Sequence, residues 1–213
     1  MGDREVRAYY DELSAAYQRD RNQSFFAASL ARYLEMLGPA PGRTLEVGCG
    51  PGAYAAELLR RGLDAHGVDF SPQMCEIARA SCRAALASGS AEEAERRIAC
   101  ADCEESVGFG GLFDSIALID CWETFPHPGK VMRTVEKALR PGGRLLIVTP
   151  NFTFKPLLWT LETLRIKKLR PAFLHGNSRV STTRRLVGPQ FRELAIGSYF
   201  FGLERYFVFE KKA

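Results

Sequence analysis

The order of apolar and polar positions divides most of the chain into strands and helices. Five short apolar runs lie between residues 43 and 149, and most are separated by segments with apolar residues at helical spacing. Strands that alternate with helices form βαβ units, which require a parallel sheet. We expect strands over residues 43–47, 65–69, 97–101, 113–120 and 144–149, and helices over residues 4–17, 24–37, 53–61, 72–86 and 129–139.

The last part of the chain departs from this alternation. Residues 191–200 and 204–209 are aromatic-rich runs joined by a short turn, which predicts an antiparallel hairpin. The stretch over residues 85–95 is rich in small residues and glutamate, and we expect it to end a helix and continue as a loop. The fold class is therefore α/β: a Rossmann-like, doubly wound sheet of seven strands, mostly parallel, with a C-terminal antiparallel hairpin strand and two N-terminal lid helices.

The length of 213 residues fits one α/β domain. An apolar share of 46% with 25% charged residues is ordinary globular composition. We expect a single domain over residues 1–213, made of an N-terminal helical lid (1–40), a core (43–150), a cap or insert (151–190) and a closing hairpin (191–213).

The strongest motif is Thr-Leu-Glu-Val-Gly-Cys-Gly-Pro-Gly at residues 44–52, which ends the first strand in a glycine-rich turn and opens a helix. Glycines in such a turn let the backbone approach a ligand closely. The second strand ends at Asp69, 21 residues after Gly48. A carboxylate at that position suits the two hydroxyls of a ribose. The pattern predicts a ligand that contains adenosine.

Three segments together resemble the class I S-adenosylmethionine-dependent methyltransferases, in particular their broad small-molecule group. They are LEVGCGPG at residues 45–52, VDFS at residues 68–71 and LRPGG at residues 139–143. The resemblance extends over residues 5–150. It implies S-adenosylmethionine (SAM) as cofactor, S-adenosylhomocysteine (SAH) as product, and an enzyme that methylates oxygen, nitrogen or carbon of a small or amphipathic acceptor. These motifs specify the cofactor and leave the acceptor and the oligomeric state open.

The resemblance also implies which residues hold the methionyl part of the cofactor. By this likeness Gly48 and Gly50 pack against it, and Glu46 helps to hold its ammonium group. Asp120, at the end of the fourth strand, forms the floor of this part of the site.

For the adenosine part, the resemblance implies that Asp69 binds the ribose hydroxyls and that Phe70 and Met74 flank the adenine ring. Asp102 and the amide of Cys103 would read the polar edge of that ring. Each of these residues has a plain structural alternative as a loop carboxylate or a core side chain.

Residues 9–17, YYDELSAAY, resemble the family's N-terminal lid helix, in which a tyrosine covers the cofactor carboxylate. Tyr17 is the candidate, with Tyr10 as the second choice. An aromatic residue at helical spacing is equally typical of a core position.

The loop after the fourth strand contains the candidate catalytic residues. A general base is needed only if the acceptor carries a proton that must leave. Glu123 and His127 are the candidates, although His127 stands between two prolines and equally suits a surface turn. Many relatives carry a His-His pair and an aspartate in this loop, so the departure leaves the identity of a base open. His175 is a third candidate, and His66 is expected to be structural.

The charge is unevenly distributed along the chain. Residues 1–150 hold 17 basic and 21 acidic residues, whereas residues 151–213 hold 12 and 4. Seven basic residues and no acidic one lie between residues 165 and 185. We expect residues 157–185 to contact the small-molecule acceptor, an anionic surface or the periphery of a membrane. For residues 157–169 the alternative is a helix packed on the sheet edge with its basic residues in water, and for the basic residues between 165 and 185 it is an irregular, solvated loop.

The cysteines and the N-terminus bear on the metal content and the location of the protein. The six cysteines are scattered, which indicates reduced thiols. Cys100 and Cys103 have metal-site spacing, but no second pair accompanies them, so we expect no metal.

The N-terminus is charged and lacks the features of a secretory signal. These features predict a cytoplasmic protein.

Other functional classes remain open. The basic C-terminal part would suit an RNA or protein methyltransferase, but no Asn/Asp-Pro-Pro-Tyr motif and no RNA-binding module are visible, so we expect no nucleic-acid partner. A nucleotide-dependent oxidoreductase would carry a GxGxxG turn and a Tyr-x-x-x-Lys pair. A noncatalytic SAM-binding regulatory subunit would keep the same fold.

Overall fold

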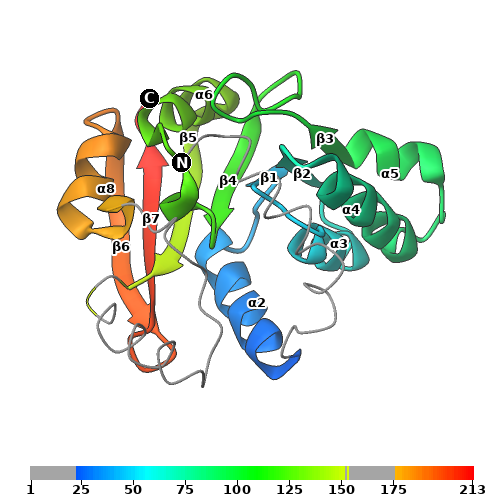
Figure 1. Ribbon diagram of the computed structural model, residues 1–213, viewed down its shortest axis with the longest axis horizontal. Helices are drawn as coiled ribbons and strands as arrows, with labels where there is room; N and C mark the ends of the chain where they lie inside the picture. The colour runs from blue at the N-terminus through cyan, green and yellow to red at the C-terminus, as the bar shows by residue number, and fades with distance from the viewer. Residues whose placement is uncertain (1–22, 152, 154–175) are drawn as a thin grey trace.

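The computed structural model describes residues 23–151, 153 and 176–213 (Figure 1). The predicted helix at residues 4–17 with Tyr10 and Tyr17, His175, and most of the predicted insert lie outside the described residues. The elements in chain order are α2 (Gln23–Leu37), β1 (Thr44–Val47), α3 (Ala53–Arg60), β2 (Ala65–Asp69), α4 (Pro72–Ala85), α5 (Ala91–Arg97), β3 (Ile98–Cys100), β4 (Phe113–Ile119), the 3₁₀ turn η1 (Trp122–Thr124), α6 (Pro128–Ala138), β5 (Leu139–Pro150), the 3₁₀ turn η3 (Gly176–Ser178), α8 (Val180–Val187), β6 (Phe191–Tyr199) and β7 (Glu204–Lys211).

All seven strands form one sheet in the order β3-β2-β1-β4-β5-β7-β6. The first five strands run parallel to one another, and β7 is antiparallel to both β5 and β6. The predicted doubly wound sheet with a closing antiparallel hairpin is therefore confirmed. The strand order reverses between β1 and β4, and ligands of such sheets bind outside the carboxyl ends of the strands at this point.

Helices cover both faces of the sheet (Figure 1). Alternate residues of a strand point to opposite faces. In β4, Ala117 and Ile119 therefore pack with residues of α2, α3 and α4, while Ile116 and Leu118 pack with residues of α6 and α8. The two hydrophobic clusters lie on either side of one sheet, which makes the three-layer arrangement of a doubly wound fold.

The second predicted N-terminal helix is α2, and it packs on the sheet. Leu30, Tyr33 and Leu37 are buried in the same cluster as Leu146 and Val148 of β5. This burial holds α2 against the layer that also contains α3 and α4.

Local signals set the limits of two helices as the sequence predicted. Ser71 caps α4, because its hydroxyl accepts a hydrogen bond from the amide of Met74 at 3.2 Å and Pro72 occupies the first helical position. Gly62 follows α3 with a φ of +73° and donates its amide to the carbonyl of Leu59 at 2.9 Å. The left-handed conformation of this glycine ends the helix.

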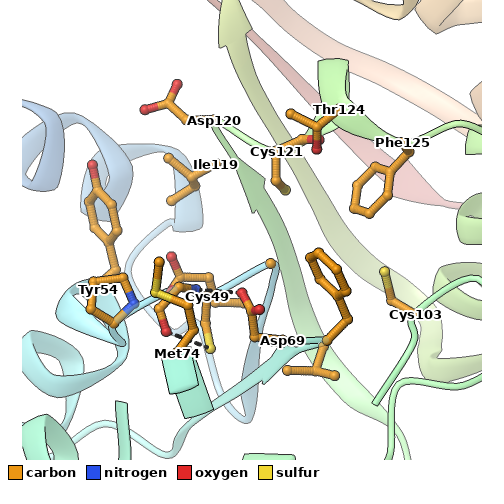
Figure 2. Close-up of a pocket in the computed structure, with 16 residues that line it drawn as sticks. Cys49, Tyr54, Asp69, Met74, Cys103, Ile119, Asp120, Cys121, Thr124 and Phe125 are labelled. Carbon is orange, nitrogen blue, oxygen red and sulfur yellow. Dashed lines mark hydrogen bonds between the residues drawn. The ribbon is translucent and has the colours of Figure 1, made fainter. Parts of the chain in front are cut away.

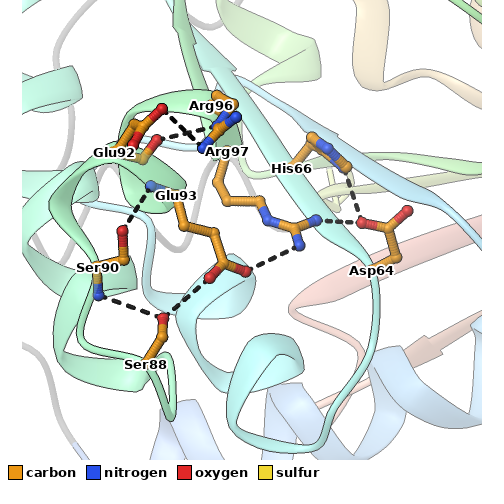
Figure 3. A network of polar contacts seen from close by, with 8 residues as sticks. All are labelled: Asp64, His66, Ser88, Ser90, Glu92, Glu93, Arg96 and Arg97. Carbon is orange, nitrogen blue, oxygen red and sulfur yellow. Dashed lines mark hydrogen bonds and ion pairs between the residues drawn. The ribbon is translucent and has the colours of Figure 1, made fainter.

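Two helices were missed, and the prediction of loops in their place was wrong. The first is α5, which lies in and after the stretch expected to be a loop; it begins at Ser90, whose hydroxyl accepts a hydrogen bond from the amide of Glu93 at 3.2 Å (Figure 3). The second is α8, which lies in the part of the insert expected to be irregular. Both are short surface helices that bury only one or two side chains, so they leave almost no apolar periodicity in the sequence.

The strand expected over residues 144–149 is part of a longer β5, which begins at Leu139 and includes the glycine-rich residues 141–143. Leu139 pairs with Phe113 and Arg144 pairs with Ser115, so the ladder shifts register between these pairs. Gly142 lies within the shift and has a φ of +72°. The glycine-rich segment therefore forms an irregularity in the strand, as is typical of β-bulges.

Candidate functional site

A pocket opens beyond the carboxyl ends of β1, β2 and β4, at the point where the strand order reverses (Figure 2). Its empty volume is about 770 Å³, including the open solvent at its mouth. It is lined by Glu46, Gly48, Cys49, Gly50, Pro51, Tyr54, Val68, Asp69, Phe70, Met74, Cys103, Ile119, Asp120, Cys121, Thr124 and Phe125.

The glycine-rich turn forms one wall of the pocket. Gly48 has a φ of +69°, and a Cβ added there would lie 2.8 Å from the Cβ of Cys121. A side chain at this position would therefore push the turn away from the end of β4. The amides of Gly48 and Cys49 donate to the carbonyl of Val68 at 2.8 and 3.1 Å, which fixes the turn on β2. The exposed backbone of the turn can approach a ligand closely.

Asp69 joins two loops at the edge of the pocket. Its Oδ2 accepts a hydrogen bond from the amide of Gly50 at 2.8 Å, and its Oδ1 accepts one from the amide of Ser71 at 3.0 Å. The residue is only 8% exposed. Backbone amides therefore hold both carboxylate oxygens in place, as a preorganised binding group requires.

Two apolar side chains follow Asp69 on the same wall. Phe70 lies in the loop between β2 and α4, and Met74 is buried in the first turn of α4. The cap formed by Ser71 fixes this turn, and Figure 2 shows the Asp69 carboxylate near Met74. Phe70 lines the same pocket, so the β2–α4 junction supplies a carboxylate and two apolar groups. Such a set can hold a ribose and a planar ring.

Cys103 and Asp102 have different surroundings. Cys103 is buried and lines the pocket, and burial raises the pKa of its thiol. Asp102 is exposed and is not part of the pocket wall; its Oδ1 accepts a hydrogen bond from the amide of Glu104 at 2.8 Å. The structure thus uses this carboxylate in a local turn, and the predicted contact of Asp102 with an adenine edge stays a prediction.

Asp120 lies at the carboxyl end of β4 with a φ of +53°. A non-glycine residue in this left-handed region costs about 1–2 kcal/mol. Its amide donates to the carbonyl of Val148 at 3.0 Å, which holds the strained residue to β5. Strained backbone is concentrated at functional sites, and here it coincides with the pocket wall.

Eight of the ten residues predicted for the cofactor line this one pocket: Glu46, Gly48, Gly50, Asp69, Phe70, Met74, Cys103 and Asp120. Asp102 lies outside its wall, and Tyr17 is outside the described residues. The tertiary structure therefore brings together residues at or after the ends of four strands, β1 to β4, that are up to 74 positions apart in the chain.

Neither candidate base lines the pocket. Glu123 is fully buried and is not part of the pocket wall, and its Oε2 accepts a hydrogen bond from the Thr149 hydroxyl at 2.9 Å. The same hydroxyl lies 2.9 Å from that of Ser178. His127 is exposed at the start of α6, and its amide donates to Glu104 at 2.9 Å. Both residues have structural surroundings, and their catalytic roles stay predictions without a contact in the pocket.

Several pocket residues were not predicted. Tyr54, from the first turn of α3, packs edge-on against Tyr33 at 5.5 Å between ring centroids. Thr124, the last residue of η1, and Phe125, which follows it, form the wall opposite the glycine-rich turn (Figure 2). Their place in the loop after β4 was a usable signal, because that loop was already expected to face the acceptor.

Within the ranges that the structure describes, no group of three potential metal ligands comes together. All six cysteines are free thiols.

The profile of a methyltransferase-domain family matches residues 17–184, which is most of the chain. This match covers the glycine-rich turn, the Asp69 loop and the end of β4. The chain belongs to this methyltransferase family. The resemblance to class I SAM-dependent methyltransferases that the sequence motifs predicted is confirmed.

Two curated relatives share the core of this methyltransferase domain. A protein named ubiquinone biosynthesis O-methyltransferase from Xanthomonas axonopodis pv. citri is 30% identical over 117 residues, which are 55% of this chain and 46% of that protein. A protein of the same name from Coxiella burnetii is 29% identical over 133 residues, which are 61% of this chain and 53% of that protein. The chain therefore matches about half the length of these relatives.

A solved structure shares the whole fold. Magnesium protoporphyrin IX methyltransferase from Synechocystis PCC 6803, crystallised with SAH, has a TM-score of 0.72 over 99% of this chain and 100% of that one, at 18% identity. At this level of identity the likeness concerns the fold.

Proposed function

We propose that this protein binds SAM in the pocket at the end of β1 and transfers its methyl group to a small-molecule acceptor. The observation that carries this proposal is the junction of the glycine-rich turn with Asp69, where a close backbone approach and a fixed carboxylate meet in one cavity. Two relatives are named O-methyltransferases, and a protein of the same fold was crystallised with SAH.

The residues of the pocket fit the parts of this cofactor. The Asp69 carboxylate suits the ribose hydroxyls, and the apolar side chains of Phe70 and Met74 suit the adenine ring. At the other end Glu46 and Asp120 offer carboxylates for an ammonium group. When bound, SAM supplies a methyl group on a positively charged sulfonium. The protein's part is then to align the acceptor with that methyl group and to exclude water.

The wall formed by Cys121, Thr124 and Phe125 is mostly apolar, and we propose that it receives the acceptor. Burial raises the pKa of the Cys121 thiol, so this side chain is neutral and apolar at physiological pH. Such a wall favours a partly apolar or aromatic acceptor.

We also propose that residues 157–185 contact the acceptor or an anionic surface, and that the protein works in the cytoplasm. The basic character of residues 157–185 supports the contact with the acceptor or an anionic surface.

The six free cysteines support the proposed cytoplasmic location, because thiols stay reduced in the cytosol. Among the described residues, no helix is long and apolar enough to span a membrane.

Titration calorimetry with SAH tests the cofactor half of the proposal. We expect binding with a dissociation constant on the order of micromolar, and its loss in Asp69→Ala, which removes the carboxylate from the pocket. Glu92→Gln is the matched control, because it removes an exposed carboxylate on α5 and is expected to leave binding unchanged. Absence of SAH binding by the unaltered protein would refute the assignment.

Detection of a methylated product tests the methyl-transfer half of the proposal. The protein is incubated with SAM labelled in the methyl group and with cell extracts, with and without lipids, and the labelled product is identified by mass spectrometry. We expect a labelled small molecule. Tight SAH binding with no labelled product in any extract would instead support a noncatalytic SAM-binding subunit.

A further inference from the structure

Two cysteines lie on neighbouring elements beside the Asp69 loop. Cys75 is in the first turn of α4, and Cys100 is the last residue of β3. In the ladder between β2 and β3, Cys100 pairs with Asp69, the pocket carboxylate. The Cys75 thiol donates to the main-chain carbonyl of the same Asp69 at 3.3 Å and to that of Ala99 at 3.7 Å. The thiol of Cys75 therefore lies over the carboxyl ends of β2 and β3.

The two cysteine side chains are on the same side of the sheet. Alternate residues of a strand face opposite sides. Ile98 packs in the cluster that contains Cys75, whereas Ala99 packs against the cluster on the other side. Cys100 therefore points to the side of α4, as Ile98 does. There the thiols of Cys75 and Cys100 are close enough to interact directly.

The two thiols differ in their exposure to solvent. Cys100 is exposed, whereas Cys75 is completely buried. Burial raises the pKa of the Cys75 thiol, and its interaction with Cys100 acts in the same direction. A dissolved oxidant therefore reacts first with Cys100. A solvent-accessible thiol next to a second, resolving thiol is a common arrangement in redox-sensitive sites.

The cysteine pair is connected to the wall that suits the adenosine part of SAM. Cys75 directly follows Met74, which lines the pocket, and its thiol donates to the main chain of Asp69. The sulfurs of a disulfide are about 2 Å apart, so a bond between Cys75 and Cys100 would draw the first turn of α4 towards β3. It would also remove the thiol proton that the Asp69 carbonyl accepts. Both changes act on residues that line the pocket.

We propose that Cys75 and Cys100 form a reversible disulfide that weakens the binding of SAM and SAH. Hydrogen peroxide oxidises the Cys100 thiol to a sulfenic acid and is reduced to water. The Cys75 sulfur then attacks the Cys100 sulfur, the S–S bond forms, and the sulfenic hydroxyl leaves as water with the Cys75 proton. A dithiol such as dithiothreitol reverses the reaction by thiol–disulfide exchange and is itself oxidised to its cyclic disulfide.

The effect on cofactor binding rests on the proposed function, whereas the formation of the disulfide is a separate property of the two cysteines. The first can be measured with SAH, and the second needs neither SAM nor an acceptor.

Peptide mapping of the full chain tests the bond. The protein is treated with hydrogen peroxide, alkylated and digested with trypsin without reduction. We expect the peptide of residues 62–79, which contains Cys75, to be linked to the peptide of residues 98–130, which contains Cys100. Fragment spectra distinguish Cys100 from Cys103 and Cys121 in the second peptide. Dithiothreitol is expected to remove the link.

Two variants show whether the link needs this pair. Cys100→Ser replaces an exposed thiol, so the fold is kept, and no link to Cys75 is expected. Cys82→Ala is the matched control, because Cys82 is buried on the same helix about two turns further along. This variant is expected to form the link as the unaltered protein does.

Calorimetry with SAH measures the consequence for the pocket. We expect the affinity of the unaltered protein to fall by about fivefold or more after peroxide treatment and to recover with dithiothreitol. Cys100→Ser is expected to bind SAH as the reduced, unaltered protein does, before and after peroxide, because Cys100 is not part of the pocket. Oxidation of Met74 would also occur in Cys100→Ser and would persist after dithiothreitol, so these two comparisons separate it from the disulfide.

Two results would overturn the proposal. One is a peroxide-treated protein without a link between Cys75 and Cys100, and the other is a linked protein with unchanged SAH affinity. Failure of SAH binding in the reduced, unaltered protein would refute the proposed function and with it the effect on cofactor binding. The linked peptide would in that case still establish the disulfide.

Discussion

Asp69 lies at the end of β2, whereas Asp120 and Glu123 follow β4, and the surroundings of these three carboxylates separate their roles. Asp69 accepts hydrogen bonds from two loop amides at the pocket edge. Asp120 lines the pocket in a strained conformation. Glu123 is buried away from it and accepts a hydrogen bond from Thr149. The positions and hydrogen-bond partners of these carboxylates therefore suit Asp69 and Asp120 for ligand binding and Glu123 for a structural role.

The buried position of Glu123 predicts a structural effect on substitution. Glu123→Ala leaves the Thr149 hydroxyl without its carboxylate acceptor inside the protein, so we expect the free energy of unfolding to fall by about 1–3 kcal/mol. His127→Ala removes an exposed side chain and is expected to change it by less than about 0.5 kcal/mol. Urea denaturation measures both changes.

SAH affinity is the control for these two variants, and we expect it to be unchanged in each because neither residue lines the pocket. If Glu123→Ala kept full stability but lost methyl transfer, the catalytic role that the sequence suggested for Glu123 would be supported instead.

At the scale of elements, the junction of the glycine-rich turn with α3 depends on its contact with α4. Gly52 is the N-cap of α3 with a φ of +71°, and a Cβ there would lie 2.8 Å from the Cβ of Ala78. Since Ala78 is buried in α4, an added methyl group would push the two helices apart. The close packing of α3 on α4 thus requires the third glycine of the motif.

Two glycine substitutions separate backbone strain from this packing. Gly52 and Gly62 have φ values of +71° and +73°, but a Cβ at Gly62 would meet no atom within 4 Å. We expect Gly62→Ala to destabilise the protein by about 1–2 kcal/mol through strain alone. Gly52→Ala is expected to cost about 1–3 kcal/mol more, because a clash is added. Thermal unfolding monitored by circular dichroism compares them, and equal losses would contradict the packing argument.

At the scale of the whole molecule, His66 couples folding to pH. It is buried on β2 between the rings of Phe109 and Phe113, with centroids 5.2 and 5.6 Å away. Burial lowers its pKa to about 4, with Arg43 and Arg97 acting in the same direction and Asp64 opposing them (Figure 3). The predicted structural role of His66 agrees with these surroundings.

This shift predicts a loss of stability in mild acid. The unfolded chain takes up a proton on His66 near pH 6.5, whereas the folded protein does so only near pH 4. The contribution of neutral His66 to the free energy of unfolding is therefore complete above about pH 6.5. It falls by on the order of 2 kcal/mol as the pH decreases towards 4. Denaturation across this range measures it. His66→Gln is expected to flatten the slope, and an NMR titration that gave His66 an ordinary pKa would contradict the prediction.

The sequence by itself determined the fold class and the cofactor side of the pocket, because both depend on local signals. The alternation of apolar runs and helical segments predicted the five parallel strands, and two aromatic-rich runs predicted the closing hairpin. The glycine-rich turn and Asp69 each belong to a single strand–turn–helix unit, so short segments of sequence reveal them. The short helices α5 and α8 escaped prediction because they bury too little to leave a periodic pattern.

Only the tertiary structure decided which side chains after β4 face the pocket. In a 3₁₀ turn successive side chains point about 120° apart, so neighbours in sequence face different surroundings. The buried Trp122 donates to the carbonyl of Asn177 at 3.0 Å, 55 residues away, and this contact fixes the rotation of the turn. Glu123 is then directed into the core and Thr124 lines the pocket. A local sequence pattern cannot predict this contact, because Trp122 and Asn177 are 55 residues apart in the chain.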